Sequence, residues 1–136
     1  MAETITRTER GWAGHFICGY RCRFHRNTLL TKGNRHIVVS TVGDMMGERF
    51  EGVESIGYCD KPRFYETMVF RGQVDAPYIE MDVSHQLYTD GLEWAICATD
   101  AKSLPADADI QADAMHESTV AYSMTHFDAT WEKPNV

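Results

Sequence analysis

The sequence predicts an α+β domain: an antiparallel sheet of about five strands, built from hairpins, with a C-terminal helix packed on one face. Three observations lead to this fold class. Several short segments in the first two thirds of the chain alternate apolar and polar residues, as half-buried strands do. Turn-forming residues separate these segments. An alanine-rich stretch near the C-terminus has the composition of a helix.

The chain has the length of a single domain. A domain of 136 residues buries roughly two thirds of the surface that its unfolded chain exposes, so folding needs neither a disulfide nor a metal. The sequence contains no repeat, low-complexity tract or linker, and we take residues 1–136 as a single domain. We expect the four cysteines to be free thiols.

Charged residues and the N-terminus indicate a cytoplasmic protein. No stretch free of Asp, Glu, Lys and Arg exceeds ten residues, whereas a membrane-spanning helix needs about 20 apolar residues. The first residues lack the basic start and apolar core of a secretory signal. We therefore expect no contact with a membrane.

The clearest local prediction is a hairpin formed by residues 24–31 and 36–42. A Gly-Asn dipeptide between them makes a two-residue loop that tolerates positive φ. This loop places Leu30 opposite Ile37. Apolar residues near the turn should therefore reach both faces of the sheet.

Three further strands are predicted at residues 53–58, 64–71 and 78–84. Pro62 interrupts the pattern between the first two, because proline cannot donate a hydrogen bond to a neighbouring strand. The last strand has the most regular alternation in the sequence. Its core-facing residues are expected to be Ile79, Met81 and Val83.

A helix is predicted from Ser103 to about His126. Pro105 suits its first turn, where the helix dipole also favours anionic side chains. One stripe of the helix should pack on the sheet and consists of Ile110, Ala114, Ala121 and Met124.

A second stripe of this helix, which we call the acidic ridge, consists of Asp109, Asp113 and Glu117. Like charges four residues apart on a helix cost a few tenths of a kcal/mol each. The ridge is therefore either a solvated surface or a surface that binds a basic partner. Asp107, which precedes the ridge in the sequence, is also expected to contact such a partner.

Charge is distributed unevenly along the chain. Residues 1–36 carry seven Lys or Arg and two acids, a net charge of +5, and the remainder carries 6 bases and 18 acids, a net charge of −12, which together give −7. This asymmetry can steer association with a charged partner. Alternatively, the basic segment pairs with acidic residues of its own fold or of a second copy of the chain.

A group of metal-ligand residue types lies in one short segment, with the spacing His-x2-Cys-x3-Cys-x2-His: His15, Cys18, Cys22 and His25. Such residues bind zinc. In a helix the outer two would lie about 15 Å apart, so all four could share an ion only in a looped segment. The simpler expectation is no cofactor, with buried thiols and hydrogen-bonded histidines, and a zinc site is the alternative.

Two other catalytic arrangements are compatible with the sequence. A thiol near Arg21 could act as a nucleophile, because cations lower a thiol pKa. Glu66 and His85 could face one another as acid and base. The sequence contains no glycine-rich phosphate loop, no His-Glu-x-x-His and no Gly-x-Ser-x-Gly motif, so a binding protein is favoured over an enzyme.

Several segments resemble a family of small hypothetical proteins encoded by phages and prophages. They are residues 11–18, which read Gly-Trp-Ala-Gly-His-Phe-Ile-Cys, together with Arg21-Cys22, Arg26–Leu30, Ile37–Gly43 and Tyr65–Met68. The resemblance implies an accessory protein that acts in the cytoplasm of a bacterial host. Small acidic phage proteins are similar in this respect to inhibitors of host defence, including anti-CRISPR proteins.

We therefore expect a protein that binds and inhibits a host defence protein or nucleoprotein complex. The acidic ridge would occupy the place where a basic channel of the host complex expects phosphate, and direct nucleic-acid binding by this acidic chain is not expected. The alternative is a metal- or thiol-dependent enzyme centred on His15, Cys18, Cys22 and His25. A third hypothesis is a homo-oligomer in which the basic segment docks on the acidic face of its neighbour.

Overall fold

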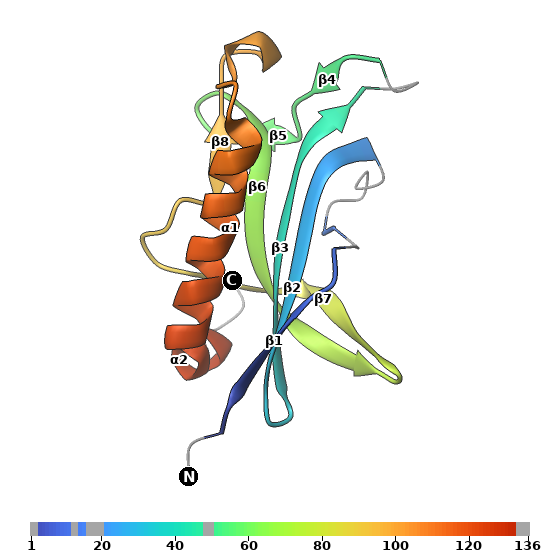
Figure 1. Ribbon diagram of the computed structural model, residues 1–136, viewed down its shortest axis with the longest axis vertical. Coiled ribbons are helices and arrows are strands. Elements are labelled where there is room, and N and C mark those ends of the chain that lie inside the picture. The colour runs from blue at the N-terminus through green and yellow to red at the C-terminus, as the bar shows by residue number, and fades with distance from the viewer. Residues whose placement is uncertain (1–2, 12–13, 16–20, 48–50, 133–136) are drawn as a thin grey trace.

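The computed structural model describes residues 3–11, 14–15, 21–47 and 51–132, and shows an antiparallel sheet with a long helix along one face (Figure 1). Its strands are β1 (Ile5–Glu9), β2 (Cys22–Lys32), β3 (Arg35–Met46), β4 (Val53–Glu54), β5 (Gly57–Tyr58), β6 (Pro62–Asp75), β7 (Tyr78–Leu87) and β8 (Ala95–Cys97). Its helical elements are the 3-10 turn η3 (Ala101–Ser103), α1 (Ala108–Thr125) and α2 (Phe127–Glu132). The α+β class and the C-terminal helix are confirmed.

The sheet is organised around the long strands β2, β3 and β6. Strands β1, β2, β3, β6 and β5 pair in that order, β4 pairs with β3, and β7 and β8 both pair with β6. All of these pairings are antiparallel. Strand β6 has 14 residues, which is long enough to pair with two strands in succession: its first part pairs with β8 and its second part with β7.

The described residues form an eight-stranded sheet, more than the five strands predicted. The single strand expected at 53–58 is divided into β4 and β5, and β1 and β8 were not predicted. These four elements have two to five residues each, which is too short for apolar periodicity to identify them. They form because β2, β3 and β6 offer free edges.

The predicted hairpin is confirmed in its register. Leu30 lies opposite Ile37, and the loop between Lys32 and Arg35 contains Gly33 with a φ of 61°. A residue with a side chain is strained at that φ. The glycine therefore fixes the alignment of β2 with β3.

The predicted alternation of the last strand is only partly correct. Ile79 and Met81 are half-buried, but Val83 is 63% exposed. The register explains the difference: Met81 lies opposite Gly72 and Gln86 opposite Phe70, so residues 82–85 occupy the space facing a single residue of β6. Such an irregularity interrupts the strict in-and-out alternation of a strand.

The prediction for the buried stripe of the helix is wrong for three of its four residues. Ile110 is 69% exposed, and Ala114 and Ala121 are also exposed, whereas Met124 is half-buried and packs against the core. The face that α1 buries consists of Ala108, Ala112, Met115, His116, Thr119, Val120 and Ser123. Much of this face is small or polar, so its hydrophobicity did not mark it in the sequence.

Two apolar clusters fill the space between the helices and the sheet. One cluster consists of Leu30, Ile37, Val39, Val69, Leu87, Val120 and Phe127. The other consists of Phe64, Tyr65, Ala98, Ala108, Ala112 and Met115. Together they pack both ends of α1 on the sheet.

A buried line of polar side chains lies between these clusters, with His116 at its centre. Its Nδ1 lies 2.7 Å from Thr41 Oγ1, which lies 2.6 Å from Thr67 Oγ1, and its Nε2 lies 2.7 Å from Thr28 Oγ1. Thr28 also donates to the carboxylate of Glu9 at 2.9 Å. Because an ionised carboxylate only accepts, the Thr28 oxygen must accept from His116 Nε2, which therefore carries a proton. Burial lowers the pKa of His116 to about 4, so the ring is neutral near pH 7 and its Nδ1 accepts from Thr41.

The buried position of His116 predicts how stability depends on pH. Burial, reinforced by the positive charge of Arg26, lowers the pKa of His116 to about 4. The unfolded chain, with a histidine pKa of about 6.5, therefore binds a proton that the folded chain excludes. The stability contributed by the neutral imidazole is present above the unfolded pKa and is lost as the pH falls toward the folded pKa.

We expect the free energy of unfolding to fall by about 2 kcal/mol between about pH 7 and about pH 5 because of His116 alone. Denaturant titrations at several pH values measure this slope. The variant His116→Gln should have a flatter profile over the same range, although it is less stable at neutral pH. A variant with an unchanged slope would show that another group is responsible.

Candidate functional site

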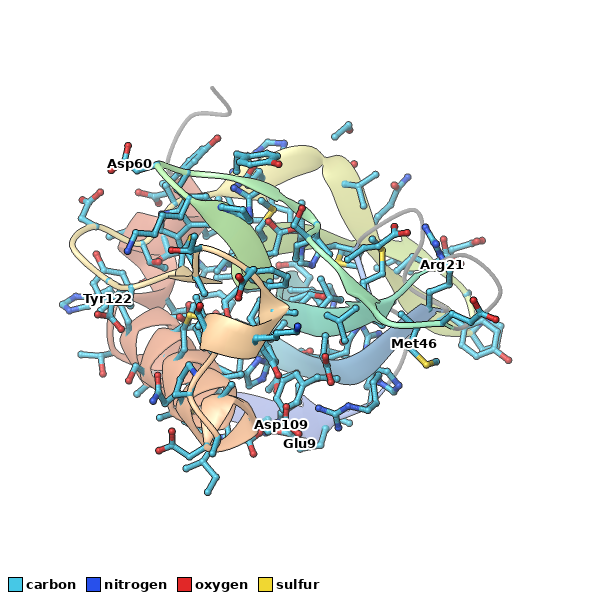
Figure 2. All side chains as sticks on the ribbon, turned by 90° about the horizontal axis from the view of Figure 1, so that it is seen from above. Glu9, Arg21, Met46, Asp60, Asp109 and Tyr122 are labelled. Carbon is cyan, nitrogen blue, oxygen red and sulfur yellow. The ribbon has the colours of Figure 1, made fainter. Side chains whose placement is uncertain are left out.

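The acidic ridge lies against strands β1 and β2. Arg26 contacts Asp113 at 3.4 Å and Glu117 at 3.1 Å, and Arg7 contacts Glu117 at 2.7 Å. Arg23 contacts Asp109 at 2.7 Å. Figure 2 shows Asp109 and Glu9 on the same side of the molecule, where the helix meets these strands.

The ion pairs hold the ridge carboxylates in their charged form. Hydrogen bonds from Arg7 are the main reason that the pKa of Glu117 falls to about 2. Burial acts to raise the pKa of Asp109, but hydrogen bonds from Arg23 and from the Tyr65 hydroxyl outweigh it and lower that pKa. The ridge is thus matched by arginines of the same fold, one of the two alternatives that the charge asymmetry left open.

Asp107 has a different role from the ridge residues. It lies just before the first residue of α1, and its carboxylate accepts a hydrogen bond from Gln111 Nε2 at 2.9 Å. It remains exposed. Three of the four acids expected to contact a partner, the ridge residues, therefore form ion pairs that attach the helix to the sheet. Asp107 forms no such contact in the structure described.

The residues expected to bind metal have separate surroundings where they are described. Cys22 is buried in an apolar cluster with Val42, Met45 and Ile56. His25 Nδ1 donates to the carbonyl of Gly11 at 2.5 Å, and His15 binds other partners described below. Cys18 lies outside the described residues. Within the described part of the chain, no group of three or more His, Cys, Asp or Glu has the geometry of a metal site.

His15 lies in a buried polar network on the sheet face opposite α1. Its Nδ1 is 2.9 Å from Ser40 Oγ, and its Nε2 is 3.1 Å from Glu66 Oε1. The other oxygen of Glu66 is 2.8 Å from Nε of Arg63. Sequence reasoning named Glu66 but expected His85 as its partner, because it could not place residues 14–15 over the sheet. A close approach of Gly14 to Val42 makes that placement feasible, since a Cβ on Gly14 would lie 2.4 Å from Val42 Cγ1.

The row of Ser40, His15 and Glu66 contains the residue types of a hydrolase triad. In such a triad the serine contacts Nε2 and the carboxylate contacts Nδ1, whereas here the two contacts are exchanged. Ser40 is fully buried, and the side chains of His15 and Glu66 are only 4% and 3% exposed. A substrate cannot reach these groups, so the network is better described as a polar part of the interior.

The hairpin of β6 and β7 carries three large apolar side chains that are exposed to solvent. We call residues 72–85 the β6–β7 arm; in Figure 1 it extends away from α1 beyond the other strands. Val74, Tyr78 and Val83 are 61%, 69% and 63% exposed. Arg10, in the segment after β1, donates hydrogen bonds to Asn27 Oδ1 and to the carbonyl of Ile79, which ties the arm to the sheet.

The arm also carries acidic side chains that the fold does not neutralise. The arm contains no Lys or Arg, and its acids are Asp75, Glu80 and Asp82. None of the ion pairs between described residues involves Asp75, Glu80 or Asp82. Sequence reasoning counted these acids in the total charge but did not locate them on one projecting hairpin.

Two hollows border the segment that follows the arm. One, of about 260 Å³, is lined by residues that include Met68, Leu87 and Trp94. The other, of about 310 Å³, lies between Leu92 and the exposed side of α1. Neither contains the charged groups of the His15 network.

No helix within the described ranges is both long and apolar enough to cross a lipid bilayer.

Comparison with protein-family models, curated proteins and solved structures found no match to this chain. The assignment of a functional surface therefore depends on the geometry described above.

The ion pairs of the ridge predict an effect on stability. Each exposed pair contributes about 0.2–1 kcal/mol, so reversing Asp109, Asp113 and Glu117 to lysine should lower the free energy of unfolding by roughly 1–3 kcal/mol. Denaturant titration measures this loss, which should shrink at high salt. The matched reversal Asp75→Lys with Glu80→Lys removes no ion pair and should leave stability nearly unchanged. Equal losses in the two variants would contradict the assignment.

Removing the buried carboxylate of Glu66 should be more damaging than any single change on the ridge. Glu66→Ala leaves Arg63 without its partner and His15 without its acceptor, and loss of one member of a buried ion pair costs about 3–5 kcal/mol. Glu66→Gln keeps a hydrogen-bond acceptor and should cost less. Thermal unfolding of both variants tests the order, and an alanine variant as stable as wild type would show that the network contributes nothing.

Proposed function

We propose that this protein acts by binding another protein through the β6–β7 arm, and that the protein bound belongs to a host defence complex. The observation that carries the proposal is that one projecting hairpin combines exposed Val74, Tyr78 and Val83 with carboxylates that form no ion pair among the described residues. Protein interfaces combine aromatic and apolar anchors with a polar rim in this way.

Strand β7 offers backbone groups as well as side chains. Among the described strands β7 pairs only with β6, so its outer edge has no strand partner. A free edge can accept an extended segment of another protein by adding a strand to the sheet. The arm carries two of the usual protections of an edge strand, its acidic side chains and its irregular register, and Arg10 already occupies the carbonyl of Ile79.

The charge of the arm favours a basic partner. Asp75, Glu80 and Asp82 would lie opposite lysines or arginines, such as those with which a nucleic-acid enzyme contacts phosphates. The resemblance to phage and prophage proteins supplies the partner class, a host defence protein or nucleoprotein complex. Relative to the expectation from sequence, the proposed contact surface moves from the acidic ridge to the arm.

Affinity capture from a bacterial host lysate tests the proposal. The tagged protein should retain a defence protein, and Tyr78→Ala combined with Asp75→Lys and Glu80→Lys should lose it while folding normally. The matched control, Asp107→Lys with Glu132→Lys, changes two exposed acids outside the arm and should retain the partner.

Three results would contradict the proposal or a part of it. Retention of the same partner by the arm variant would exclude the arm as the contact surface. Equal loss in the arm variant and the control would show that total charge, rather than this surface, determines binding. Capture of a partner unrelated to defence would leave the surface assigned and refute the partner class.

A further inference from the structure

One of the two hollows, of about 260 Å³, lies where the edge of β6 changes its strand partner. On this edge β8 pairs with β6 up to Glu66, and β7 pairs with it from Val69 onward (Figure 1). Residues 67 and 68 therefore lie between the two described partner strands. The Thr67 N–H donates instead to the carbonyl of Trp94 at 2.8 Å. The chain between β7 and β8 leaves the sheet at this point, and the hollow remains beside β6.

The apolar walls of this hollow are already in place. Leu87 and Val69 line it, are 1% and 3% exposed, and belong to a core cluster. Trp94 also lines it and is held in two ways: its carbonyl accepts from β6, and its ring centroid lies 4.9 Å from the guanidinium of Arg63. A ligand that enters such a preformed site loses little binding energy to the ordering of side chains.

The polar groups of the hollow carry no charge. Among the described residues that line it none is Asp, Glu, Lys, Arg or His, so a charged ligand would be buried there without a counter-charge. Gln86, Tyr88 and Thr89 can each offer a donor or an acceptor and do not select between ligands. Thr67 differs from them, because it is 3% exposed and its hydroxyl is fixed by a bond of 2.6 Å to Thr41.

The line of hydrogen bonds through His116 gives the Thr67 hydroxyl a direction. The Thr28 hydroxyl donates to the carboxylate of Glu9, so His116 Nε2 donates to Thr28. The neutral ring then accepts from Thr41 at Nδ1. That bond uses the single proton of Thr41, so Thr41 Oγ1 accepts from Thr67. The proton of Thr67 is therefore directed into the interior, and its oxygen can only accept a further hydrogen bond.

We propose that this hollow binds a neutral aromatic molecule of one or two fused rings that carries a hydrogen-bond donor, and that the donor binds the Thr67 hydroxyl oxygen. An apolar cavity of about 150 Å³ holds one benzene ring, so a hollow of this volume admits one or two rings. The inference is independent of the proposed arm interface, because the residues that line the hollow lie outside residues 72–85.

Indole and benzofuran are matched probes, since they share their shape and differ in a ring N–H against a ring oxygen. In titrations of the full-length protein followed by two-dimensional NMR, both should shift the amide signals of the residues that line the hollow, in a saturable manner. Indole should bind about five-fold more tightly than benzofuran, which is the ratio expected for one net hydrogen bond.

Variants assign this preference to a single oxygen. Thr67→Val keeps the shape of the side chain and removes the acceptor, so the affinity for indole should fall to that for benzofuran. Thr119→Val is the matched control, because it removes a buried hydroxyl that donates to the Met115 carbonyl and does not line the hollow. Its preference for indole should be that of the wild type. Trp94→Ala, at a side chain that is 43% exposed, should weaken the binding of both probes.

Four outcomes would overturn the proposal. Absence of saturable shifts at the lining residues with both probes, or unchanged affinities in Trp94→Ala, would exclude the hollow as the binding site. Equal affinities of indole and benzofuran for the wild type, or a preference for indole that persists in Thr67→Val, would exclude the Thr67 oxygen as the acceptor. The wild-type comparison and Trp94→Ala decide the question even where Thr67→Val does not fold.

Discussion

The contact between α1 and the sheet through polar groups is the interaction on which the rest of this structure depends. Arg7, Arg23 and Arg26 bind the carboxylates of the helix from the strands, while His116 is fixed between two threonines of the sheet. Apolar packing alone would not specify the rotation of a helix whose buried face is mainly Ala, Thr and Ser. The directional hydrogen bonds supply that specification, since each requires a particular donor and acceptor.

This contact also accounts for the uneven charge of the chain. The basic N-terminal third and the acidic helix are separated in sequence but adjacent in space, so part of the asymmetry is cancelled within the molecule. The acids of the β6–β7 arm have no such counterpart among the ion pairs of the described residues. The carboxylates available to a basic partner are therefore those that are not already paired with arginines at the contact between the helix and the sheet.

Sequence patterns were reliable where a local rule decides the conformation. The two-residue loop at Gly33 fixed the register of β2 and β3, and the helix predicted from Ser103 to His126 is present as α1, which begins five residues later than predicted, at Ala108. They failed where neighbours decide. Val83 is exposed because residues 82–85 are not in register with β6. Ile110 is exposed because Arg23 of β2 binds the neighbouring Asp109 and so orients that side of the helix toward the sheet. Neither effect leaves a local signal.

The sequence by itself determined the fold class, the principal hairpin and the charge carried by each segment, because these follow from periodicity, turn chemistry and composition. Only the tertiary structure decided which charges meet. It placed His15 on Glu66 and Arg7 on Glu117, contacts between residues far apart in the chain. The physical reason is that the pairing of the long strands β2, β3 and β6 sets these distances, and no short-range pattern encodes the relative positions of segments that the sheet brings together.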